Sequence, residues 1–438
     1  MHAFIRFLLE RLVRLFYHTI AVSGARRIPA SGPVIVVANH PNGLIDPVIL
    51  GLALNRPVAF LAKSTFFSNP VARLAMDAFG AIPVYRTSDG AGTGKNEETF
   101  ARCRDLLSHQ GWVALFPEGT THDETTLKPF KSGAARIALS ALEEAGPALG
   151  LQVLPVGLMY EDKKIFRSRV ALGVGEPFDL AAYLDAYNEN PRAAVHQVTG
   201  LIQDSLGQVT LEAENHELWR GFMAVAAWTS PEAAGNLAAR EERSRELAGA
   251  YRRLVASDPE RADEVIAFTR RFVRMLQAVG IDDPLRLDAS DKPGVAAFTA
   301  SLLQLLLLLP LALVGALFGW LPYRLVRPLA NKLAQGKIEL IGTIKLLLGV
   351  VILTTTYVSE ATLAGNWLGW PMGLATLVLA PLTGLAALRF DERLALRRES
   401  LRAYWLRSTQ AGVAEEIRGR RRELSQMVET ALGRADRA

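Results

Sequence analysis

Short apolar runs alternate with longer helical stretches between residues 21 and 215. The run Val34–Val37 is β-branched throughout and predicts a buried strand. Turn-forming residues at positions 39–43 follow it at once. Strands that alternate with helices are typical of a layered α/β domain, because the helices must cover the faces of the sheet. The pattern therefore predicts an α/β domain over residues 21–215.

Three further apolar runs in this region also end beside polar or turn-forming residues. They are Gly80 to Arg86, Trp112 to Thr120 and Val153 to Gly157. Ligands of open α/β sheets bind beyond the carboxyl ends of the strands. We therefore expect the residues that end these runs to meet at one edge of the sheet.

Residues 1–20 have a different pattern, that of an amphipathic helix over positions 2–20. Arg6 and Arg14 lie on one half of the helical wheel, and Leu8 and Leu12 lie on the other. The segment is too charged for a signal peptide or a spanning helix. It is typical of an interfacial helix lying on lipid, and a helix packed on the domain core is the alternative.

The second half of the chain predicts helices only. Residues 216–296 are rich in Ala, Arg, Glu and Leu, and they predict two or three helices with a break near residues 257–259. A membrane-embedded region, 297–388, contains apolar tracts at about 297–322, 341–358 and 368–388. Each tract approaches the ~20 residues that cross a bilayer, and a buried helical core is the alternative. Residues 389–438 predict a basic helical tail.

The charge is concentrated in this tail. The whole chain has a formal charge of +5, and residues 389–438 carry 12 arginines and 8 acidic residues. A basic tail beside apolar spans suits an anionic membrane face. No nucleic-acid partner is expected, because the tail lacks a recognised binding motif. The single cysteine, Cys103, excludes an intrachain disulfide and a cysteine-built metal site, and we expect it to pack in a helix over Glu97 to His109.

The turn after the first strand carries a candidate catalytic pair, His40 and Asp46. An aspartate can hold one nitrogen of a histidine ring and leave the other free to take a proton. In a chain with 7 histidines and 44 acidic residues such a pair also arises by chance. The segments that follow it along the chain therefore matter to the interpretation.

Taken in order, the four segments resemble the motif blocks of the glycerophospholipid acyltransferases, the superfamily of glycerol-3-phosphate and 1-acylglycerol-3-phosphate acyltransferases. The resemblance covers about residues 30–180. It implies an α/β acyltransferase domain with a central mixed sheet flanked by helices, followed by a helical region and C-terminal membrane helices. It also implies direct transfer from acyl-CoA or acyl carrier protein to a glycerol-phosphate acceptor, with no cofactor and no metal.

Two departures point to one branch of this superfamily. Five residues separate His40 from Asp46 where four are usual, and Thr121-His122-Asp123 stands where the usual third block has an arginine. Both resemble the dual-substrate glycerol-3-phosphate/dihydroxyacetone-phosphate acyltransferases of fungi and their bacterial relatives. The missing arginine leaves one phosphate contact open. The cations available to replace it are Arg86, Lys128, Lys131 and Arg136.

The resemblance assigns His40 as the general base and Asp46 as the residue that orients it. The expected substrate-binding residues are Asn39, Asn42, Gly80, Ile82, Pro83, Arg86, Phe116, Pro117, Glu118, Gly119, Thr120, Lys131 and Pro155. Within this set, the turn at 118–120 is a candidate for stabilising the oxyanion. Arg86 and Lys131 would hold phosphate, and Pro155 would shape a strand end.

Several alternatives stay open. Glu118 can instead cap the segment that follows it or pair with a cation, and His122 with Asp123 can form a second His–Asp pair. The acceptor can be another lysolipid. Functions of another class are a lipid hydrolase and a non-catalytic membrane scaffold. No serine lies in a Gly-x-Ser-x-Gly elbow, so a covalent acyl-enzyme is not required.

The basic residues also predict a membrane arrangement. Residues 323–340 carry four cations and one acid, and short basic segments prefer the cytoplasm. We expect the tract 297–322 to re-enter or lie on the surface, bent at Pro310, and the next two tracts to form a hairpin. The protein would then be integral to a bacterial cytoplasmic membrane, with membrane lipids as partners and the catalytic domain facing the cytoplasm.

Overall fold

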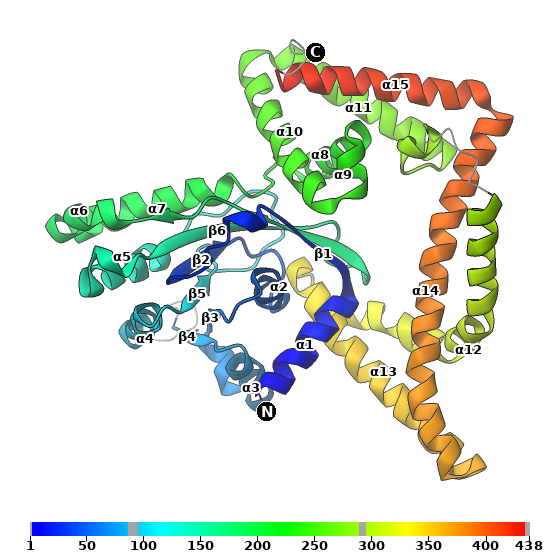
Figure 1. Ribbon diagram of the computed structural model, residues 1–438, viewed down its shortest axis with the longest axis horizontal. Helices are drawn as coiled ribbons and strands as arrows, with labels where there is room; N and C mark the ends of the chain where they lie inside the picture. The colour runs from blue at the N-terminus through cyan, green and yellow to red at the C-terminus, as the bar shows by residue number, and fades with distance from the viewer. Residues whose placement is uncertain (1, 86–93, 95, 289–294, 434–438) are drawn as a thin grey trace. The chain divides into compact units, whose positions relative to one another are not determined.

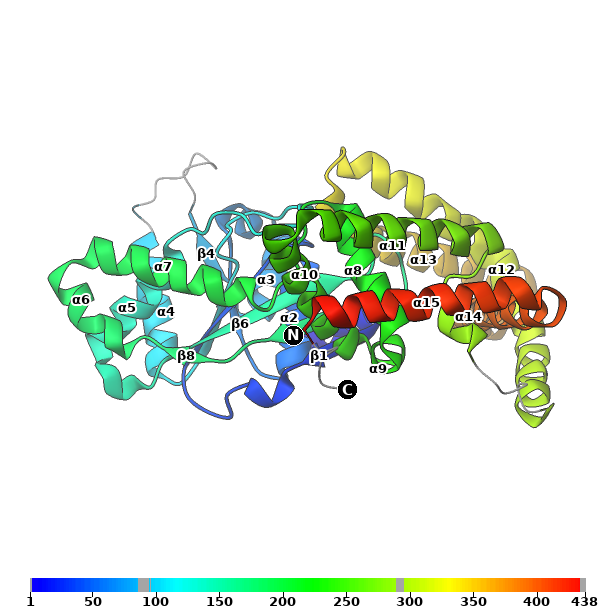
Figure 2. The ribbon, with the colours of Figure 1, turned by 90° about the horizontal axis from the view of Figure 1, so that it is seen from above.

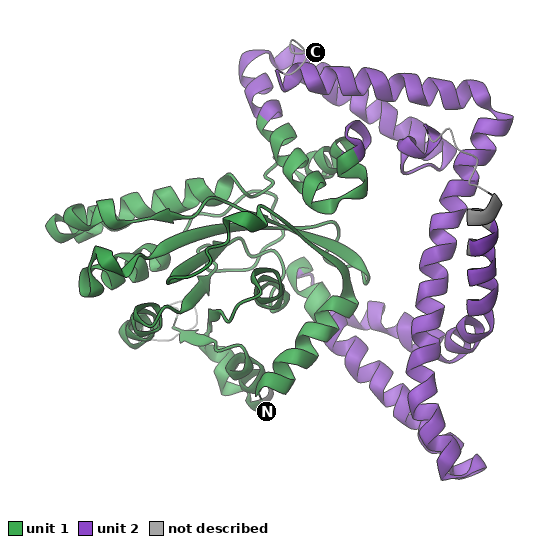
Figure 3. Ribbon diagram, viewed as in Figure 1, with its two compact units in different colours: residues 1–226, 232–249, 338–343 green, residues 227–231, 250–337, 344–438 purple. Residues whose placement is uncertain are grey.

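The computed structural model describes residues 2–85, 94, 96–288 and 295–433. The chain forms two compact units (Figure 3). Unit 1 comprises residues 1–226, 232–249 and 338–343, and unit 2 comprises residues 227–231, 250–337 and 344–438. Each is described by itself.

Unit 1 is built on an eight-stranded mixed sheet (Figure 1). Its strands are β1 (Tyr17–Ser23), β2 (Val34–Ala38), β3 (Ala59–Lys63), β4 (Ile82–Val84), β5 (Trp112–Leu115), β6 (Gln152–Tyr160), β7 (Ser168–Val174) and β8 (Phe178–Asp179). The order is β1-β7-β6-β2-β5-β3-β4, and β8 pairs with β6. β6 is parallel to β2 and antiparallel to β7 and β8. The prediction of a mixed sheet flanked by helices is confirmed.

The helices of unit 1 connect these strands. They are α1 (His2–Phe16), α2 (Ile45–Leu54), α3 (Pro70–Ala78), α4 (Asn96–Ser108), α5 (Gly133–Ala145), α6 (Leu184–Glu189), α7 (Pro191–Gly207), most of α8 (His216–Thr229), α9 (Pro231–Gly235) and the first part of α10 (Leu237–Ser257). Side chains of α4, α5 and α7 form one core with those of β2, β5 and β6. Cys103 of α4 is buried in it, as expected.

Strand β2 is buried along its whole length because it is paired on both sides, with β5 and with β6. Burying one valine or isoleucine side chain contributes roughly 1.5–3 kcal/mol. The run at 34–37 therefore holds the start of the following turn firmly at the edge of the sheet.

The N-terminal helix is shorter than predicted. α1 ends at Phe16, and Tyr17 starts β1, which pairs in parallel with β7. The segment from Tyr17 has no clear alternation of apolar and polar residues, and partners in the sheet determine its conformation. In α1, Val13 and Phe16 are buried, whereas Phe4, Phe7 and Leu8 are exposed. The helix thus packs through its C-terminal end and leaves apolar side chains uncovered at its start.

The helices of unit 2 are longer than the apolar tracts that predicted them. They are the last part of α10, α11 (Pro259–Val279), α12 (Val295–Ala334), most of α13 (Ile338–Leu368), α14 (Trp370–Thr409) and α15 (Ala411–Ala431). The predicted break near 257–259 is confirmed, but residues 216–288 hold four helices rather than two or three. The expected loop 323–340 is helical up to Ala334, and α13 continues through the polar segment after residue 358 as far as Leu368. Gly336 and Gly369 supply the breaks, with φ of 83° and 93°.

Three described helices are long and apolar enough to cross a membrane, judged by length and composition. The segments are Leu302–Ala334, Ile338–Leu368 and Trp370–Thr409. α12 contains Pro310, Pro322 and Pro328 and bends along its course in Figure 1. A Cβ on Gly315 of α12 would lie 2.0 Å from the carbonyl oxygen of Thr383 in α14, so these two helices cross in close contact.

The basic tail is helical, and several of its arginines are used inside unit 2. α15 runs beside α11 in Figures 1 and 2 and buries Ile417 and Leu424. Arg421 forms an ion pair of 2.5 Å with Asp288 and donates a hydrogen bond to the carbonyl of Trp228. At least part of the tail's positive charge thus pairs within the protein and is not free for lipid headgroups.

Candidate active site

The turn after β2 leads directly into α2, and this connection carries the predicted pair. Gly43 has φ of 32°, a conformation that favours glycine, and α2 starts two residues later at Ile45. Asp46 therefore lies in the first turn of α2, and its side chain faces back towards the end of β2.

His40 and Asp46 are in contact. His40 Nδ1 lies 2.9 Å from Asp46 Oδ2. The aspartate side chain is fully buried, whereas the histidine side chain is 17% exposed. No described residue hydrogen-bonds to His40 Nε2. One ring nitrogen is thus held by the acid, and the other is available to a substrate hydroxyl.

Two further donors fix the Asp46 carboxylate. The backbone N–H of Asn42 donates to Oδ2 over 2.8 Å, and the Tyr160 hydroxyl donates to Oδ1. Burial and the neighbouring Asp46 charge raise the pKa of Tyr160 well above its usual value, so this phenol stays protonated and remains a donor. Asn42 Nδ2 also donates to the hydroxyl of Tyr17. Asp46 is therefore held in one orientation.

The residues after β5 support the His40 ring and its backbone. Phe116 stacks on the imidazole with ring centroids 3.9 Å apart. The buried Glu118 carboxylate accepts from the backbone N–H groups of His40 (3.1 Å) and Lys128 (2.9 Å), and it is also hydrogen-bonded to His122 Nε2. Glu118 thus joins the turn after β2 to the segment after β5, and its oxygens face the protein rather than an open cleft.

The second His–Asp pair has other partners. His122 Nδ1 accepts from the backbone N–H of Glu124, which leaves Nε2 to donate to Glu118. Asp123 pairs with Lys163 at 2.6 Å and lies 3.6 Å from His216 Nε2. His122 and Asp123 therefore do not pair with each other, and their contacts are those of supporting residues.

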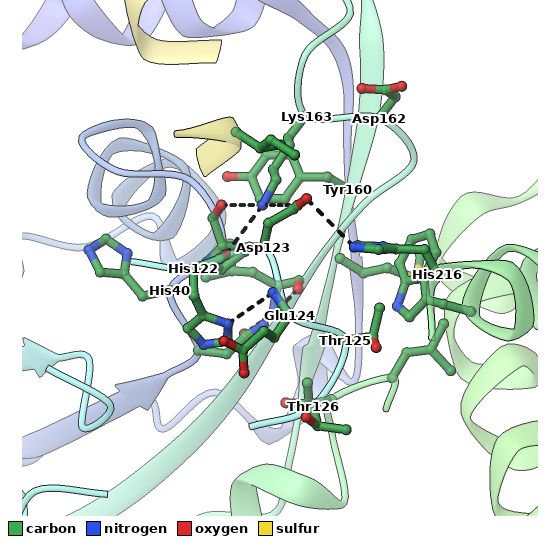
Figure 4. A pocket seen from close by; sticks show the side chains of 18 of the residues that line it. His40, His122, Asp123, Glu124, Thr125, Thr126, Tyr160, Asp162, Lys163 and His216 are labelled. Carbon is green, nitrogen blue, oxygen red and sulfur yellow. Dashed lines mark hydrogen bonds and ion pairs between the residues drawn. The ribbon is translucent and has the colours of Figure 1, made fainter. Parts of the chain in front are cut away.

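These side chains line a cavity of about 290 Å³ next to the turn (Figure 4). The backbone of His40 borders it, but the imidazole points away from it. Lys163 donates across this region to the carbonyls of Pro41 (2.8 Å) and His122 (3.3 Å). The cavity thus lies behind the histidine, and the free Nε2 faces the opposite side.

The remaining predicted residues are distributed unevenly. Asn39 exchanges two hydrogen bonds with Leu158 of β6, which fixes the start of the turn. The backbone N–H of Gly119 donates to Phe116, so it is not free for an oxyanion. Pro117 is buried, and its carbonyl accepts from the N–H of Lys131, while Thr120 and Lys131 are exposed.

Three predicted residues lie on the edge strand β4 or just before it. Gly80 has φ of 62° and precedes the strand, Ile82 is buried in the core, and the carbonyl of Pro83 accepts from Thr99. Arg86 lies outside the described residues. The structure thus assigns Ile82 to packing rather than to a substrate surface.

Pro155 does not shape a strand end. It lies inside β6, opposite Val37, at the point where the antiparallel neighbour of β6 changes from β8 to β7. Proline lacks a ladder donor, and a change of neighbouring strand is a position that tolerates this loss. The strand continues for five residues beyond it to Tyr160.

The sequence reading missed Tyr160, Tyr17 and Lys163. Tyr160 ends β6, and the rule that polar residues at strand ends form the site would have found it if the strand had been predicted at its full length. β6 runs past the end of β2, whose last residue, Ala38, pairs with Val156. Tyr17 and Lys163 carry no comparable signal in the sequence.

Comparison with known proteins finds similar sequences for the part of the chain that carries this site. Residues 19–159 match the family model described as Acyltransferase. This segment is therefore similar to the acyltransferase family. Hereafter we call it the acyltransferase domain. It contains β1 to β6 almost completely, and with them His40, Asp46 and Glu118.

Two curated relatives are named for different acceptor substrates. Glycerol-3-phosphate O-acyltransferase 2 of Saccharomyces cerevisiae is 28% identical over 285 residues, covering 61% of this chain and 38% of the relative. The chloroplastic 1-acyl-sn-glycerol-3-phosphate acyltransferase BAT2 of Brassica napus is 30% identical over 174 residues, covering 36% and 46%. The matches thus span less than half the length of these relatives.

Among solved structures, the 1-acyl-sn-glycerophosphate acyltransferase PlsC of Thermotoga maritima is similar at 22% identity, with a TM-score of 0.32 over 47% of this chain and 81% of that chain. The curated relatives named above are eukaryotic, which gives no support to the expectation of a bacterial membrane.

Proposed function

We propose that this protein is an O-acyltransferase that moves a fatty acyl group from acyl-CoA or acyl carrier protein to a hydroxyl of glycerol 3-phosphate or 1-acylglycerol 3-phosphate. The observation that carries the proposal is the His40–Asp46 contact with its free Nε2. It rests equally on the acyltransferase domain in which the pair lies.

The positions of the two residues support the following course of the transfer. Nε2 of His40 takes the proton from the acceptor hydroxyl as its oxygen attacks the thioester carbonyl. The C–O bond forms, the C–S bond then breaks, and the leaving thiolate takes the proton back from the imidazolium. Asp46 stabilises that imidazolium and keeps Nδ1 as the donor, so that Nε2 carries the lone pair.

The transfer also needs a donor that stabilises the oxyanion and a cation that holds the acceptor's phosphate. We assign both to neighbouring turns. The N–H of Thr120 has no partner in the described structure and is the candidate oxyanion donor, since that of Gly119 is already used. Among the candidate cations, Lys128 pairs with Glu124, whereas Lys131 and Arg136 have no ion-pair partner among the described residues. Lys131 lies beside Gly119 and is the better placed to hold the acceptor's phosphate.

We propose glycerol 3-phosphate as the preferred acceptor. The five-residue spacing from His40 to Asp46 and the Thr121-His122-Asp123 segment resemble the branch that uses glycerol 3-phosphate, and the yeast relative is named for that substrate. The plant relative is named for 1-acylglycerol 3-phosphate, which makes it the runner-up.

A transfer assay tests both statements. Protein purified in detergent would receive labelled acyl-CoA or acyl carrier protein and a panel of acceptors: glycerol 3-phosphate, dihydroxyacetone phosphate, 1-acylglycerol 3-phosphate and other lysolipids. We expect glycerol 3-phosphate to be acylated with the highest kcat/KM. Release of free fatty acid without any acylated acceptor would instead indicate a hydrolase, and no turnover of any donor would favour a scaffold.

Lys131→Ala tests the phosphate contact in the same assay. We expect the KM for the acceptor to rise more than the KM for the donor, because only the acceptor's phosphate would lose its cation. Arg102→Ala, an exposed cation on α4, is the control. A change confined to the donor's KM would move Lys131 to the donor site.

We further propose that α13 and α14 cross and return through the membrane, with α12 re-entering or lying on its surface. The acyltransferase domain and the basic end of α12 would then share one side. Cysteines replacing the exposed residues Lys332 and Asn366, in a Cys103→Ala background, can be labelled on intact cells with an impermeant thiol reagent. We expect labelling at position 366 only, and labelling at 332 only would overturn the hairpin.

A further inference from the structure

A short segment of α13 belongs to the unit that holds the active site. Residues 338–343 group with unit 1, whereas the chain before them, 250–337, and after them, from 344 on, groups with unit 2. Gly342 and Thr343 are the buried residues of this helix. The start of an apolar helix is therefore packed within unit 1.

Gly342 fits against two residues of the site. A Cβ built on Gly342 would lie 2.5 Å from the carbonyl oxygen of Lys163, and 3.1 and 3.3 Å from the side-chain oxygen and nitrogen of Asn42. A separation of 2.5 Å from a backbone oxygen is shorter than van der Waals contact allows. Any side chain at position 342 must therefore displace the Lys163 backbone, the Asn42 side chain or the helix.

The next residue of the turn, Gly43, also lies against this segment of α13. A Cβ on Gly43 would lie 3.3 Å from the hydroxyl of Thr343 and 3.4 Å from Cδ2 of Leu340. The Thr343 hydroxyl and the Asn42 side-chain oxygen are both buried without a hydrogen-bond partner in the described structure. The two segments therefore meet by shape rather than through hydrogen bonds.

The residues touched are those that hold Asp46. Asn42 donates its backbone N–H to Asp46 and its side-chain NH₂ to Tyr17. The Tyr17 hydroxyl in turn donates 2.9 Å to the Lys163 carbonyl, the atom that Gly342 approaches. A shift of either partner of Gly342 would pass to the carboxylate that orients His40.

We propose that the start of α13, residues 338–343, positions the catalytic turn, with Gly342 as a positioning residue, so that acyl transfer requires this segment to be seated against Asn42 and Lys163. The proposal rests on the proposed function, because its readout is the rate of that reaction. The sequence gives no sign of it, since some 300 residues separate Gly342 from Asn42.

Gly342→Ala tests the proposal in the full-length protein in detergent, and Gly349→Ala is the matched control. Gly349 lies on the same helix with no atom within 4 Å of an added Cβ. Alanine favours helix over glycine, so neither change weakens α13 itself. We expect kcat to fall at least about 10-fold for Gly342→Ala, with the KM of both substrates within about twofold, and wild-type kinetics for Gly349→Ala.

Thr343 provides a second, independent pair. Thr343→Val keeps the shape and removes only an unpartnered hydroxyl, so we expect full activity, whereas Thr343→Leu adds volume against Gly43 and should lose kcat. This pair decides the matter if Gly342→Ala does not accumulate as folded protein, judged by size-exclusion chromatography and thermal unfolding.

The outcomes separate this proposal from the proposed function. An active wild-type protein whose Gly342→Ala and Thr343→Leu variants keep the wild-type kcat would overturn the positioning role alone. Equal losses in Gly342→Ala and Gly349→Ala would do the same, because the effect would belong to the helix and not to the contact. A wild-type protein without transfer activity would overturn the proposed function first.

Discussion

The two units of this protein place similar apolar residues in opposite surroundings. Every residue of β2 is buried, with exposed fractions of 0% from Val34 to Ala38. In α12 to α14, Leu317 is 75% exposed, Val351 is 61% exposed and Trp367 is 86% exposed. A contiguous apolar surface of this kind is unusual on a protein in water. The difference teaches that a short apolar run becomes a core strand, whereas a run of membrane-spanning length needs lipid to cover it.

The buried region also differs in how it treats polar groups. At the edge of the sheet, Asp46 and Glu118 are buried and each is held by several donors. The apolar helices carry no comparable network among their described residues. Four substitutions or reagents can break or sharpen this contrast.

The largest effect is expected at His40, whose side chain is partly exposed and contacts the buried Asp46. His40→Ala removes the base and should lower kcat about 10²–10⁴-fold or more. His109→Ala is the control, because that side chain is 77% exposed and follows α4, outside the turns that carry His40 and Glu118. Labelled acyl transfer measures both, and a His40→Ala variant with a tenth or more of the normal rate would remove His40 from the mechanism.

The next largest effect is expected in the alkylation rate of Cys103, a buried thiol in unit 1. Burial raises the pKa of Cys103 to about 12. Only the thiolate reacts, so at pH 8 alkylation should be roughly 10³-fold slower than for a free thiol of ordinary pKa. The rate should rise as the pH approaches 12. Mass spectrometry after timed alkylation measures this, with the unfolded protein as the control, and rapid labelling of the native protein at pH 8 would contradict it.

An arginine substitution compares an exposed apolar residue of unit 1 with one of the apolar helices. Ile165 in unit 1 is 56% exposed, close to the 61% of Val351 in α13. Arginine at position 351 should cost roughly 2.5–3.5 kcal/mol if that surface faces lipid, whereas Ile165→Arg should be nearly neutral in water. The yield of protein that resists alkaline extraction from membranes measures the difference. Equal yields would show that the exposed face of α13 is not in lipid.

The smallest effect is expected from one of the donors to Asp46. Tyr160→Phe leaves the carboxylate with His40 and the Asn42 N–H, so we expect kcat to fall about 10-fold, in line with a hydrogen bond to a charged group. Asp46→Asn should lose more than this, and less than His40→Ala. Tyr187→Phe, a partly exposed tyrosine of α6, should keep the normal rate. An unchanged rate in Tyr160→Phe would show that the other two donors suffice.

Much of the acyltransferase domain could be predicted because its signals are local. The β-branched run at 34–37, the turn formers after it and the ordered strand ends gave the strand, the pair and the neighbouring turn at Glu118. The predictions failed where a distant partner decides the outcome. Tyr17 joins a strand because β7 lies beside it, and Pro155 is tolerated inside β6 because the neighbouring strand changes there.

The sequence by itself determined the alternation of strands and helices and the presence of three long apolar segments, since each depends on residues that are near one another in the chain. Only the tertiary structure decided which groups hold Asp46, why Glu118 faces inward and that Gly342 closes on Asn42. Those contacts join residues from β1, β6 and α13 with the turn after β2. No local pattern records such pairings, because burial and hydrogen bonding between distant segments depend on the packed fold rather than on neighbouring residues.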